Sequence, residues 1–519
     1  MRVISKLLPV TIDYFGGTNL KARCARGSTF LFAGSISGSV LRLIRQVILA
    51  RLLVPSEIGL MAIVLAISTS IEAFTEIGVR QSIIHNKRGA TQEYMNISWW
   101  FQFIRTSGLF VIAFWLAPWI SNFYEAPQLT LLLRVTFLGM IFSGLISPGI
   151  YVLEKELKFG KYVLVSLGCS FAGTIITVGL TFMMRNVWAL VIGFVAERVI
   201  WTLLSFIVCP FRPSFSIEQS CLSDLLTYAR RMFGVPMLAV LAFQTDILVL
   251  GKTVTKEELG LYSFAFILAQ VPSSLFGKII NPVLLPAFAK KQVDKIDLRN
   301  AVIELTKIVA LISIPTIAFI AIHSNSIMSL VYGPRYNSAA IPFVILCGYS
   351  LIHIEGVILS SIYMAIGKPH LHRRFVLLRL TILIVLIYPS IVLFGLSGAA
   401  TAVFFANFIG LCMQVIWIRS IINLQFSHYV HCWLPGLILS PLVAAPFMIL
   451  KLFGVVSLPV IGLISGLWFL LLSFVLYRFY QPIRLGYNRN VKQVNPLLKY
   501  QQDNSISSKT QPACERTSR

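Results

Sequence analysis

Charged side chains are scarce in this chain of 519 residues. Only 12% of the residues are Asp, Glu, Lys or Arg and 57% are hydrophobic, whereas soluble proteins carry about 25% charged residues. This composition excludes an ordinary soluble domain and predicts a polytopic membrane protein. Basic residues outnumber acidic ones by 44 to 20, for a formal charge of +24. Because basic loops on one side of a membrane explain such an excess, no nucleic-acid partner is expected.

The common motifs of catalysis and metal binding are missing as well. The chain has no Walker loop, which argues against ATP hydrolysis, and no GxSxG or HExxH motif. Its eight cysteines form no CxxC pair and have no His at metal-ligand spacing, so we interpret them as small apolar core residues. We therefore expect neither an enzyme nor a bound metal or cofactor.

Long apolar runs are abundant, and they predict an all-α fold. Runs of about 19 to 27 residues between polar or Gly/Pro boundaries predict fourteen transmembrane helices. These lie at 28–53, 58–84, 95–118, 129–153, 162–184, 187–210, 228–251, 259–285, 301–323, 338–366, 373–394, 396–420, 430–451 and 455–478. No loop is long enough to fold as a separate soluble domain.

Basic residues in the loops predict the orientation. With fourteen helices, 29 Lys and Arg lie on the side of the N-terminus and six on the other. The positive-inside rule therefore places both termini in the cytoplasm. Pro9 and Asp13 break the short apolar run at the start, which predicts an uncleaved tail over 1–27. The polar, basic segment 480–519 is predicted to be a disordered cytoplasmic tail.

An internal repeat predicts two related halves. Residues 48–61 (ILARLLVPSEIGLM) resemble 249–262 (VLGKTVTKEELGLY) at an offset of 201, with Gly59 aligned to Gly260 and Arg45 to Asp246. Because both segments leave helices of the same predicted direction, the repeat is parallel. The predicted segments are an N-lobe at 28–210, an inter-lobe loop at 211–227, a C-lobe at 228–420 and accessory helices at 430–478. Two pseudo-symmetric lobes of six helices would then enclose a central cavity.

The first predicted helix carries arginines in its middle. One helical face collects the small and polar residues Ser35, Gly38, Ser39, Arg42, Arg45, Gln46 and Leu49. A helix over 28–53 exceeds the roughly 30 Å of a bilayer core, so Arg42 and Arg45 lie well inside it. Charges at that depth normally face a partner or a water-filled cavity. The stretch therefore predicts a transporter with a cationic cavity.

Other predicted helices carry buried charges too. In the second helix Ser68, Glu72, Glu76 and Arg80 are spaced four residues apart and are expected to stack on one face. Further charges in predicted spans are Arg105, Arg134, Glu197, Arg198, Asp246, Glu355 and Arg379, with His353 near Glu355. The simplest reading is that such residues form ion pairs that fix helix packing, for example Arg42 or Arg45 with Glu76. His353 alone more often has a structural role than a titrating one.

For the whole set of charged residues in predicted helices, we prefer a role in function over a role in helix packing. Arg42, Arg45, Arg105 and Arg198 outnumber Glu72 and Glu76, provided that Glu197 faces elsewhere. An excess of guanidinium groups suits a polyanion such as a diphosphate. The predicted substrate-binding residues are these four arginines. The predicted coupling or partner residues are Glu72, Glu76, Arg80, Asp246, Glu355 and Arg379.

Several stretches resemble a known family. The helix junction LARLLVPSEIGL, TEIGVRQSIIH (75–85), YVLEKELKFGKY (151–162), INPVLLPAFAKKQVDKIDLR (280–299) and VYGPRYNSAAIPFVILC (331–347) are similar to segments of bacterial polysaccharide flippases. Those flippases belong to the multidrug/oligosaccharidyl-lipid/polysaccharide exporter superfamily, and the loops resemble the colanic-acid type. The resemblance covers roughly residues 25–480.

The resemblance implies a substrate and a mechanism. Family members move an undecaprenyl-diphosphate-linked oligosaccharide across the bacterial inner membrane by alternating access, driven by an ion gradient or membrane potential. Arg45 matches a cavity arginine that engages the diphosphate in related lipid II flippases, whereas Arg42 is shifted from the nearest family arginine. A polysaccharide polymerase and a chain-length regulator are candidate partners. The coupling ion, H⁺ or Na⁺, is left open.

Two other functions remain as alternatives. An ion-coupled drug antiporter of the same superfamily would favour an acidic cavity for cationic drugs, whereas the first helix here is basic. A membrane polysaccharide polymerase or ligase would be expected to carry a large catalytic outer loop, and the predicted outer loops are short.

Overall fold

The computed structural model describes residues 20–76, 78–214, 218–232, 234–279, 284, 287–289 and 294–452. The first half contains α2 (Leu20–Leu52), α3 (Pro55–Phe74), α4 (Val79–His85), α5 (Gln92–Phe123), α6 (Leu129–Gly144), α7 (Gly149–Lys155), α8 (Phe159–Met184) and α9 (Val187–Val208). The second contains α10 (Gln219–Met232), α11 (Val235–Thr253), α12 (Lys256–Ala269), α13 (Val271–Ile279), α15 (Lys295–Tyr332), η1 (Pro334–Ala339), α16 (Ala340–Ala365), α17 (Pro369–Ile422), α18 (Phe426–His431) and α19 (Leu434–Leu452). The described residues contain no strand, which confirms the all-α class.

The chain is a multi-pass membrane protein. Within the described residues, nine helices are long and apolar enough to cross a bilayer, or eleven if each of two bent pairs forms one span. The bent pairs are α6 with α7, at 59°, and α12 with α13, at 41°. Gly395 has non-helical angles inside α17, at the boundary predicted between 373–394 and 396–420. The predicted helix at 455–478 lies outside the described residues, so the count of fourteen stays a prediction.

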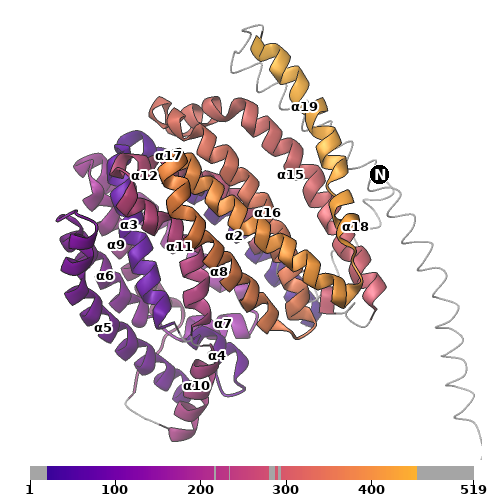
Figure 1. Cartoon of the computed structure of the whole chain (residues 1–519). Coiled ribbons are helices and arrows are strands. Elements are labelled where there is room, and N and C mark those ends of the chain that lie inside the picture. Colours follow the sequence, from indigo (N-terminus) through magenta and orange to yellow (C-terminus); the bar gives the residue numbers. More distant parts are fainter. Residues whose placement is uncertain are drawn as a thin grey trace, which may run out of the picture. The chain divides into compact units, whose positions relative to one another are not determined.

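The described residues up to Leu439 form one compact unit, and a second unit starts at Ser440. Within the first unit, the helices pack in two groups. In the N-terminal group α2 packs on α8, α8 and α6 pack on α9, and α5 packs on α6. In the C-terminal group α16 packs on α15 and α17, α11 on α17, and α12 on α16. Figure 1 shows α15, α16 and α17 running beside one another.

The two groups meet where α3 packs on α11 and α12. At this seam a Cβ on Gly59 would lie 1.9 Å from the carbonyl oxygen of Lys256, and a Cβ on Gly260 would lie 1.9 Å from that of Pro55. These two glycines are the pair aligned by the sequence repeat. Only glycine permits so close a backbone approach. The related segments therefore face each other across the seam.

Polar contacts reinforce the seam at the end of the bundle where α2 turns into α3, which we call the α2–α3 end. Lys252 Nζ lies 2.6 Å from Glu125 Oε1, and Tyr124 Oη donates to the Leu248 carbonyl at 3.1 Å. Arg51 donates to the Leu330 carbonyl at 2.6 Å. The two helix groups are thus closed against each other at the α2–α3 end.

The second predicted helix is wrong as a continuous helix. α3 ends at Phe74, and Gly78 adopts the left-handed conformation (φ 72°) before α4 begins. Glu76 and Arg80 therefore do not continue the stack from Ser68 and Glu72. Because Gly takes positive φ without steric cost, it divides the apolar run here.

The seventh predicted helix, 228–251, is also divided. Gly234 (φ 81°) separates α10 from α11. α10 begins within the predicted inter-lobe loop, 211–227, and runs past its end to Met232. It packs on the N-terminal group: Cys221, Leu225 and Ala229 are buried against Val79, Ile83, Tyr94 and Ile97. The ninth predicted helix, 301–323, is in fact longer, because Asp294 caps α15 by accepting from the backbone NH of Ile296 at 2.7 Å.

An ion-pair latch holds α10 in place. Arg88 lies 3.2 Å from both Glu218 and Asp224, and Asn86 donates to Asp224 at 3.0 Å. Hydrogen bonds from Asn86 and then Arg88 hold the pKa of Asp224 below its usual value. Because the pKa is lowered by docking, the latch contributes stability above the ordinary Asp value of about 4. This stability is lost as the pH falls through the lower docked value.

We predict that Gly59→Ala and Gly260→Ala each lower the melting temperature of the detergent-purified protein. Each added methyl group overlaps a carbonyl oxygen across the seam, and overpacking of this kind costs about 1–3 kcal/mol. Gly108→Ala on α5 is the control, since its Cβ would meet no atom within 4 Å. An unchanged melting temperature for both seam variants would contradict the close approach.

We also predict that Arg88→Gln exposes Cys221. This residue lies on the face of α10 that packs against the N-terminal group and is 1% exposed. Loss of the latch should raise the maleimide labelling rate of its thiol by about two- to fivefold, as expected for exposed ion pairs. High salt should raise the wild-type rate in the same direction by screening the latch. Lys87→Gln, at the exposed neighbouring position, is the control. Equal labelling of both variants would show that the ion pairs do not hold α10.

Candidate functional site

The two arginines of α2 have different partners. Arg45 Nη1 lies 2.9 Å from Glu197 Oε2 on α9. Arg42 Nη2 donates to Ser39 Oγ at 3.1 Å, one turn earlier on the same helix. Among the described residues, no carboxylate comes within the 4.0 Å of an ion pair with Arg42. Arg42 is therefore a half-buried cation whose charge is not locally paired.

α8 makes room for the carboxylate that pairs with Arg45. A Cβ on Gly173 would lie 2.9 Å from Glu197 Cγ, so a larger residue there would displace the Glu197 side chain. The predicted excess of arginine assumed that Glu197 faces away from the others. That assumption is wrong, because Glu197 faces Arg45.

The other two predicted arginines lie near the remaining glutamates. Arg105 Nη2 is 3.7 Å from Glu76 Oε2, while its Nη1 donates to Thr75 Oγ1 at 3.0 Å. Arg198 Nη2 is 3.6 Å from Glu72 Oε2. Both separations exceed hydrogen-bond distance. The two pairs are electrostatic neighbours, held more loosely than Arg45 and Glu197.

Neutral groups complete the environment of Arg198. Its Nη1 donates to Ser143 Oγ on α6 at 3.0 Å, and its guanidinium carbon lies 5.2 Å from the ring centre of Phe194. A weakly paired guanidinium above an aromatic ring keeps its charge available while its orientation is fixed. This arrangement leaves the charge of Arg198 able to bind an anion, which a fully hydrogen-bonded ion pair would not.

The charge balance of this site leaves one positive charge. The four predicted arginines face three glutamates, Glu72, Glu76 and Glu197. Lys278 on α13 adds a second positive charge, because it lies near enough to Arg42 for the two cations to repel each other. α13 also packs on α2. The unpaired charge therefore gathers where the two helix groups meet through α2 and α13.

The remaining predicted acids lie in the C-terminal group. Asp246 on α11 accepts a hydrogen bond from Tyr262 Oη at 2.8 Å. Glu355 on α16 accepts from Thr306 Oγ1 at 3.0 Å and from Tyr429 Oη at 2.8 Å, and its Oε1 has no partner among the described residues. Neither carboxylate forms an ion pair with a described residue within 4.0 Å. They are buried acids stabilised by hydroxyl groups.

Arg80 and Arg379 also lie outside the cluster of arginines. Arg80 on α4 binds Glu154 on α7 at 2.8 Å and is exposed. Arg379 on α17 donates to Asn407 Oδ1 at 3.0 Å. Arg134, which the sequence also placed in a span, lies 4.3 Å from the ring centre of Phe114. The predicted charged set is thus divided among several places and does not line one surface.

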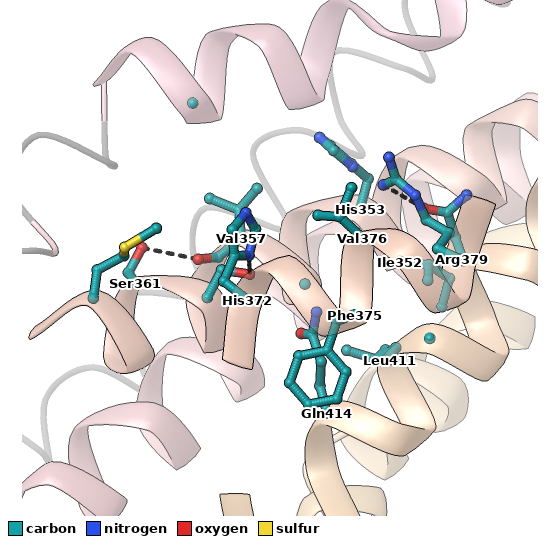
Figure 2. Close-up of a pocket in the computed structure, with 16 residues that line it drawn as sticks. Ile352, His353, Val357, Ser361, His372, Phe375, Val376, Arg379, Leu411 and Gln414 are labelled. Carbon is teal, nitrogen blue, oxygen red and sulfur yellow. Dashed lines mark hydrogen bonds between the residues drawn. The ribbon is translucent and has the colours of Figure 1, made fainter. Parts of the chain in front are cut away.

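Arg379 lines a pocket of about 580 Å³ between α13, α16 and α17. Figure 2 shows Arg379 and His353 toward one end of this pocket and His372 and Ser361 toward the other. His372 Nδ1 is 2.9 Å from Ser360 Oγ. Among the described residues, none that lines the pocket is acidic. Its polar surface therefore suits an anionic or neutral ligand better than a cation.

Several contributing residues were not predicted, although spacing could have found some of them. Asn407 and Gln414 are seven residues apart on α17 and share a helical face. Ser143, Thr75 and Lys278 gave no such signal, because their partners lie on other helices. In the part of the chain that the structure describes, no group of three or more His, Cys, Asp or Glu could hold a metal ion.

The solved structures that resemble this chain are transporters. The chain superposes on "Lipid II flippase MurJ, inward closed conformation" with a TM-score of 0.70 and 16% identity, covering 86% of this chain and 99% of the other. A multidrug resistance MATE family transporter in an inward-facing conformation gives a TM-score of 0.57 at 13% identity, covering 76% and 98%. At such low identity these likenesses establish the fold, which is of the MurJ/MATE type.

Curated proteins resemble the chain at 23% to 26% sequence identity. The "Lipopolysaccharide biosynthesis protein WzxC" of Escherichia coli is 24% identical over 76% of this chain and 81% of its own. The "Amylovoran biosynthesis protein AmsL" of Erwinia amylovora is 26% identical over 68% and 92%. A "Probable low-salt glycan biosynthesis flippase" of Haloferax volcanii is 23% identical over 91% and 99%.

A protein-family profile described as "Polysaccharide biosynthesis protein" matches residues 48–341, which is more than half of the chain. The match includes the repeat segments, α3, α9 and the seam. The resemblance predicted from the sequence motifs is confirmed by this match and by the curated relatives. The chain belongs to the polysaccharide biosynthesis protein family.

Proposed function

We propose that this protein moves a polyprenyl-diphosphate-linked oligosaccharide from the inner to the outer leaflet of the bacterial inner membrane. The observation that carries the proposal is the unpaired guanidinium of Arg42, set among three partly satisfied arginines inside a membrane bundle. The family match and the relatives named as glycan biosynthesis proteins and flippases support the substrate class.

The diphosphate is the part of such a lipid that cannot cross hydrocarbon unaided. The idealised cost of moving one small ion from water into a medium of low dielectric is of order 20 kcal/mol. A guanidinium about 4 Å from a phosphate charge returns about 4 kcal/mol at an intermediate effective dielectric. Arg42 and Lys278 supply the two positive charges that the local glutamates leave over. The polyprenyl chain can remain in the lipid.

The three arginines that have glutamate partners provide further contacts, and they differ in how tightly they are held. Arg105 and Arg198 lie beyond hydrogen-bond distance from their glutamates, so an arriving diphosphate can compete for them. Arg45 is bound directly to Glu197 and would be shared between that carboxylate and the substrate. The glutamates then regain the arginines when the diphosphate leaves, which favours release.

The proposed motion is alternating access between an N-lobe at 28–210 and a C-lobe at 228–420. With both termini in the cytoplasm, the α2–α3 end faces outward, and its closed seam is the outer gate. The two groups also touch where α13 packs on α2. The segments 1–27, 211–227, 430–478 and 480–519 would be the N-terminal tail, the inter-lobe segment, the accessory helices and the C-terminal tail.

Coupling would use the buried acids of the C-terminal group. Asp246 and Glu355 are carboxylates with hydroxyl donors but no cationic partner among the described residues, as a group that takes up and releases H⁺ or Na⁺ requires. A polysaccharide polymerase and a chain-length regulator are the proposed partners. A drug antiporter would need an acidic cavity for cationic drugs, and the positive charge balance around Arg42 opposes it.

We predict that Arg42→Ala slows flipping of an undecaprenyl-diphosphate oligosaccharide in proteoliposomes at least tenfold. The variant removes the one arginine of the set that lacks a carboxylate, and a loss of about 1.4 kcal/mol of transition-state stabilisation already gives that factor. Arg42→Lys should recover part of the rate. Arg335→Ala, at an exposed position, is the control. A wild-type rate for Arg42→Ala would refute the proposed role.

A charge swap tests whether Arg45 does more than pair with Glu197. Arg45→Glu alone places two acids together and should reduce the amount of folded protein in the membrane. The double variant Arg45→Glu/Glu197→Arg should restore that amount while flipping stays at least tenfold below wild type, because the guanidinium then comes from α9. Full recovery of flipping in the double variant would reduce Arg45 to a structural ion pair.

A further inference from the structure

The pocket around Arg379 has the features of a ligand site separate from the arginines of α2. Its volume of about 580 Å³ lies within the roughly 300–1,000 Å³ of typical small-ligand sites. Its walls combine apolar surface from Phe375, Val376 and Leu411 with polar groups from Arg379, Asn407 and Gln414. Such a mixture of aromatic, hydroxyl, amide and cationic groups suits a sugar more than a lipid chain.

Arg379 is the only Lys or Arg among the described residues that line this pocket. Within this part of the chain, Asn407 is its one hydrogen-bond partner, through Nη1. Its Nε is buried without a partner among the described residues, as is Oε1 of Gln414. An unpaired buried polar group costs about 1–3 kcal/mol. The wall of the pocket thus contains a donor and an acceptor that the described side chains leave unpaired.

The chemistry of the charge favours a carboxylate. The guanidinium of Arg379 has used Nη1 on Asn407, and its second Nη is the donor left to bind a carboxylate oxygen. A diphosphate carries more negative charge than this single cation would balance, and Arg42 with Lys278 suits it better. A cationic ligand is disfavoured because none of the described lining residues is acidic. His353 and His372 add hydrogen-bonding groups without adding a negative charge.

α13 connects the pocket to the proposed diphosphate site. Gly277 lines the pocket, and the next residue, Lys278, lies close to Arg42. A lipid-linked sugar whose diphosphate rests at Arg42 and Lys278 would therefore have the pocket beside its glycan. Gly277 leaves the wall open at this point, since a Cβ there would meet no atom within 4 Å.

We infer that the pocket between α13, α16 and α17 is a glycan subsite that selects repeat units bearing a carboxylate, through Arg379. This inference rests on the proposed function, and it adds the chemical class of the cargo. It assigns Arg379 to recognition of the glycan, whereas the sequence suggested a role in coupling or pairing.

The test compares two lipids that differ only at one carbon. Undecaprenyl-diphosphate disaccharides that end in glucose or in glucuronate are flipped by the same proteoliposome preparation, and the ratio of the acidic to the neutral rate is measured. In the wild-type protein, the acidic lipid should be flipped at least three times as fast as the neutral one. Arg379→Gln should lower that ratio at least tenfold relative to wild type, or to unity if the wild-type preference is smaller.

Three further variants make the test more specific. Asn407→Asp places a carboxylate at the position now 3.0 Å from Arg379 Nη1, so it should occupy the guanidinium and lower the ratio as Arg379→Gln does. Arg373→Gln, exposed near the start of the same helix, should leave the ratio at its wild-type value. Arg42→Gln should lower both rates and preserve the ratio.

The possible outcomes separate the two proposals. If the wild-type protein flips neither lipid, the proposed function fails. If it flips both and the ratio is near unity, or Arg379→Gln keeps the wild-type ratio within twofold, the glycan subsite is refuted while the flippase function stands. A reduced ratio in Arg379→Gln and Asn407→Asp, with normal ratios in Arg373→Gln and Arg42→Gln, supports the subsite.

Discussion

Arginine within a bilayer is the constraint on which the rest of this structure depends. Each guanidinium inside the bundle requires a carboxylate, a neutral acceptor or water, because the lipid offers none of these. Arg45, Arg105 and Arg198 have glutamates at 2.9, 3.7 and 3.6 Å. In the part of the chain that the structure describes, Arg42 has only the hydroxyl of Ser39 as a hydrogen-bond partner. The protein thus satisfies most of its buried positive charge and keeps a remainder, as a site that must bind an anion and then release it requires.

The close packing of the seam explains how such a site can be opened and closed. Gly59 and Gly260 bring two backbones together at the α2–α3 end, and most of the charged cluster lies on helices of the N-terminal group. Lys278 lies on α13, which packs on both α16 and α2. A rotation of one group against the other would therefore change the surroundings of Arg42 without dismantling the ion pair between Arg45 and Glu197.

Much of the fold could be predicted from the sequence, because the length of an apolar run and the polar, Gly or Pro residues that bound it are local properties. The boundaries of α8 and α9, the break at Gly395 and the facing pair Gly59 and Gly260 follow from such patterns. The breaks at Gly78 and Gly234 were missed, since an apolar run does not show that a glycine inside it takes positive φ. The partners of the arginines could be foreseen only in part, because Glu197 and Arg198 are adjacent and a helix turns them to different neighbours. The pocket at Arg379 combines three helices, so no single segment predicts it.

The central claim is that Arg42 holds the diphosphate of a lipid-linked sugar. The most direct measurement is a high-resolution cryo-electron microscopy structure of the protein in nanodiscs with undecaprenyl-diphosphate oligosaccharide bound. We expect a diphosphate oxygen within about 3 Å of the Arg42 guanidinium, the distance of a charge-assisted hydrogen bond. A bound lipid whose diphosphate lies away from Arg42, with Arg42 bound to Glu197 instead, would contradict the account.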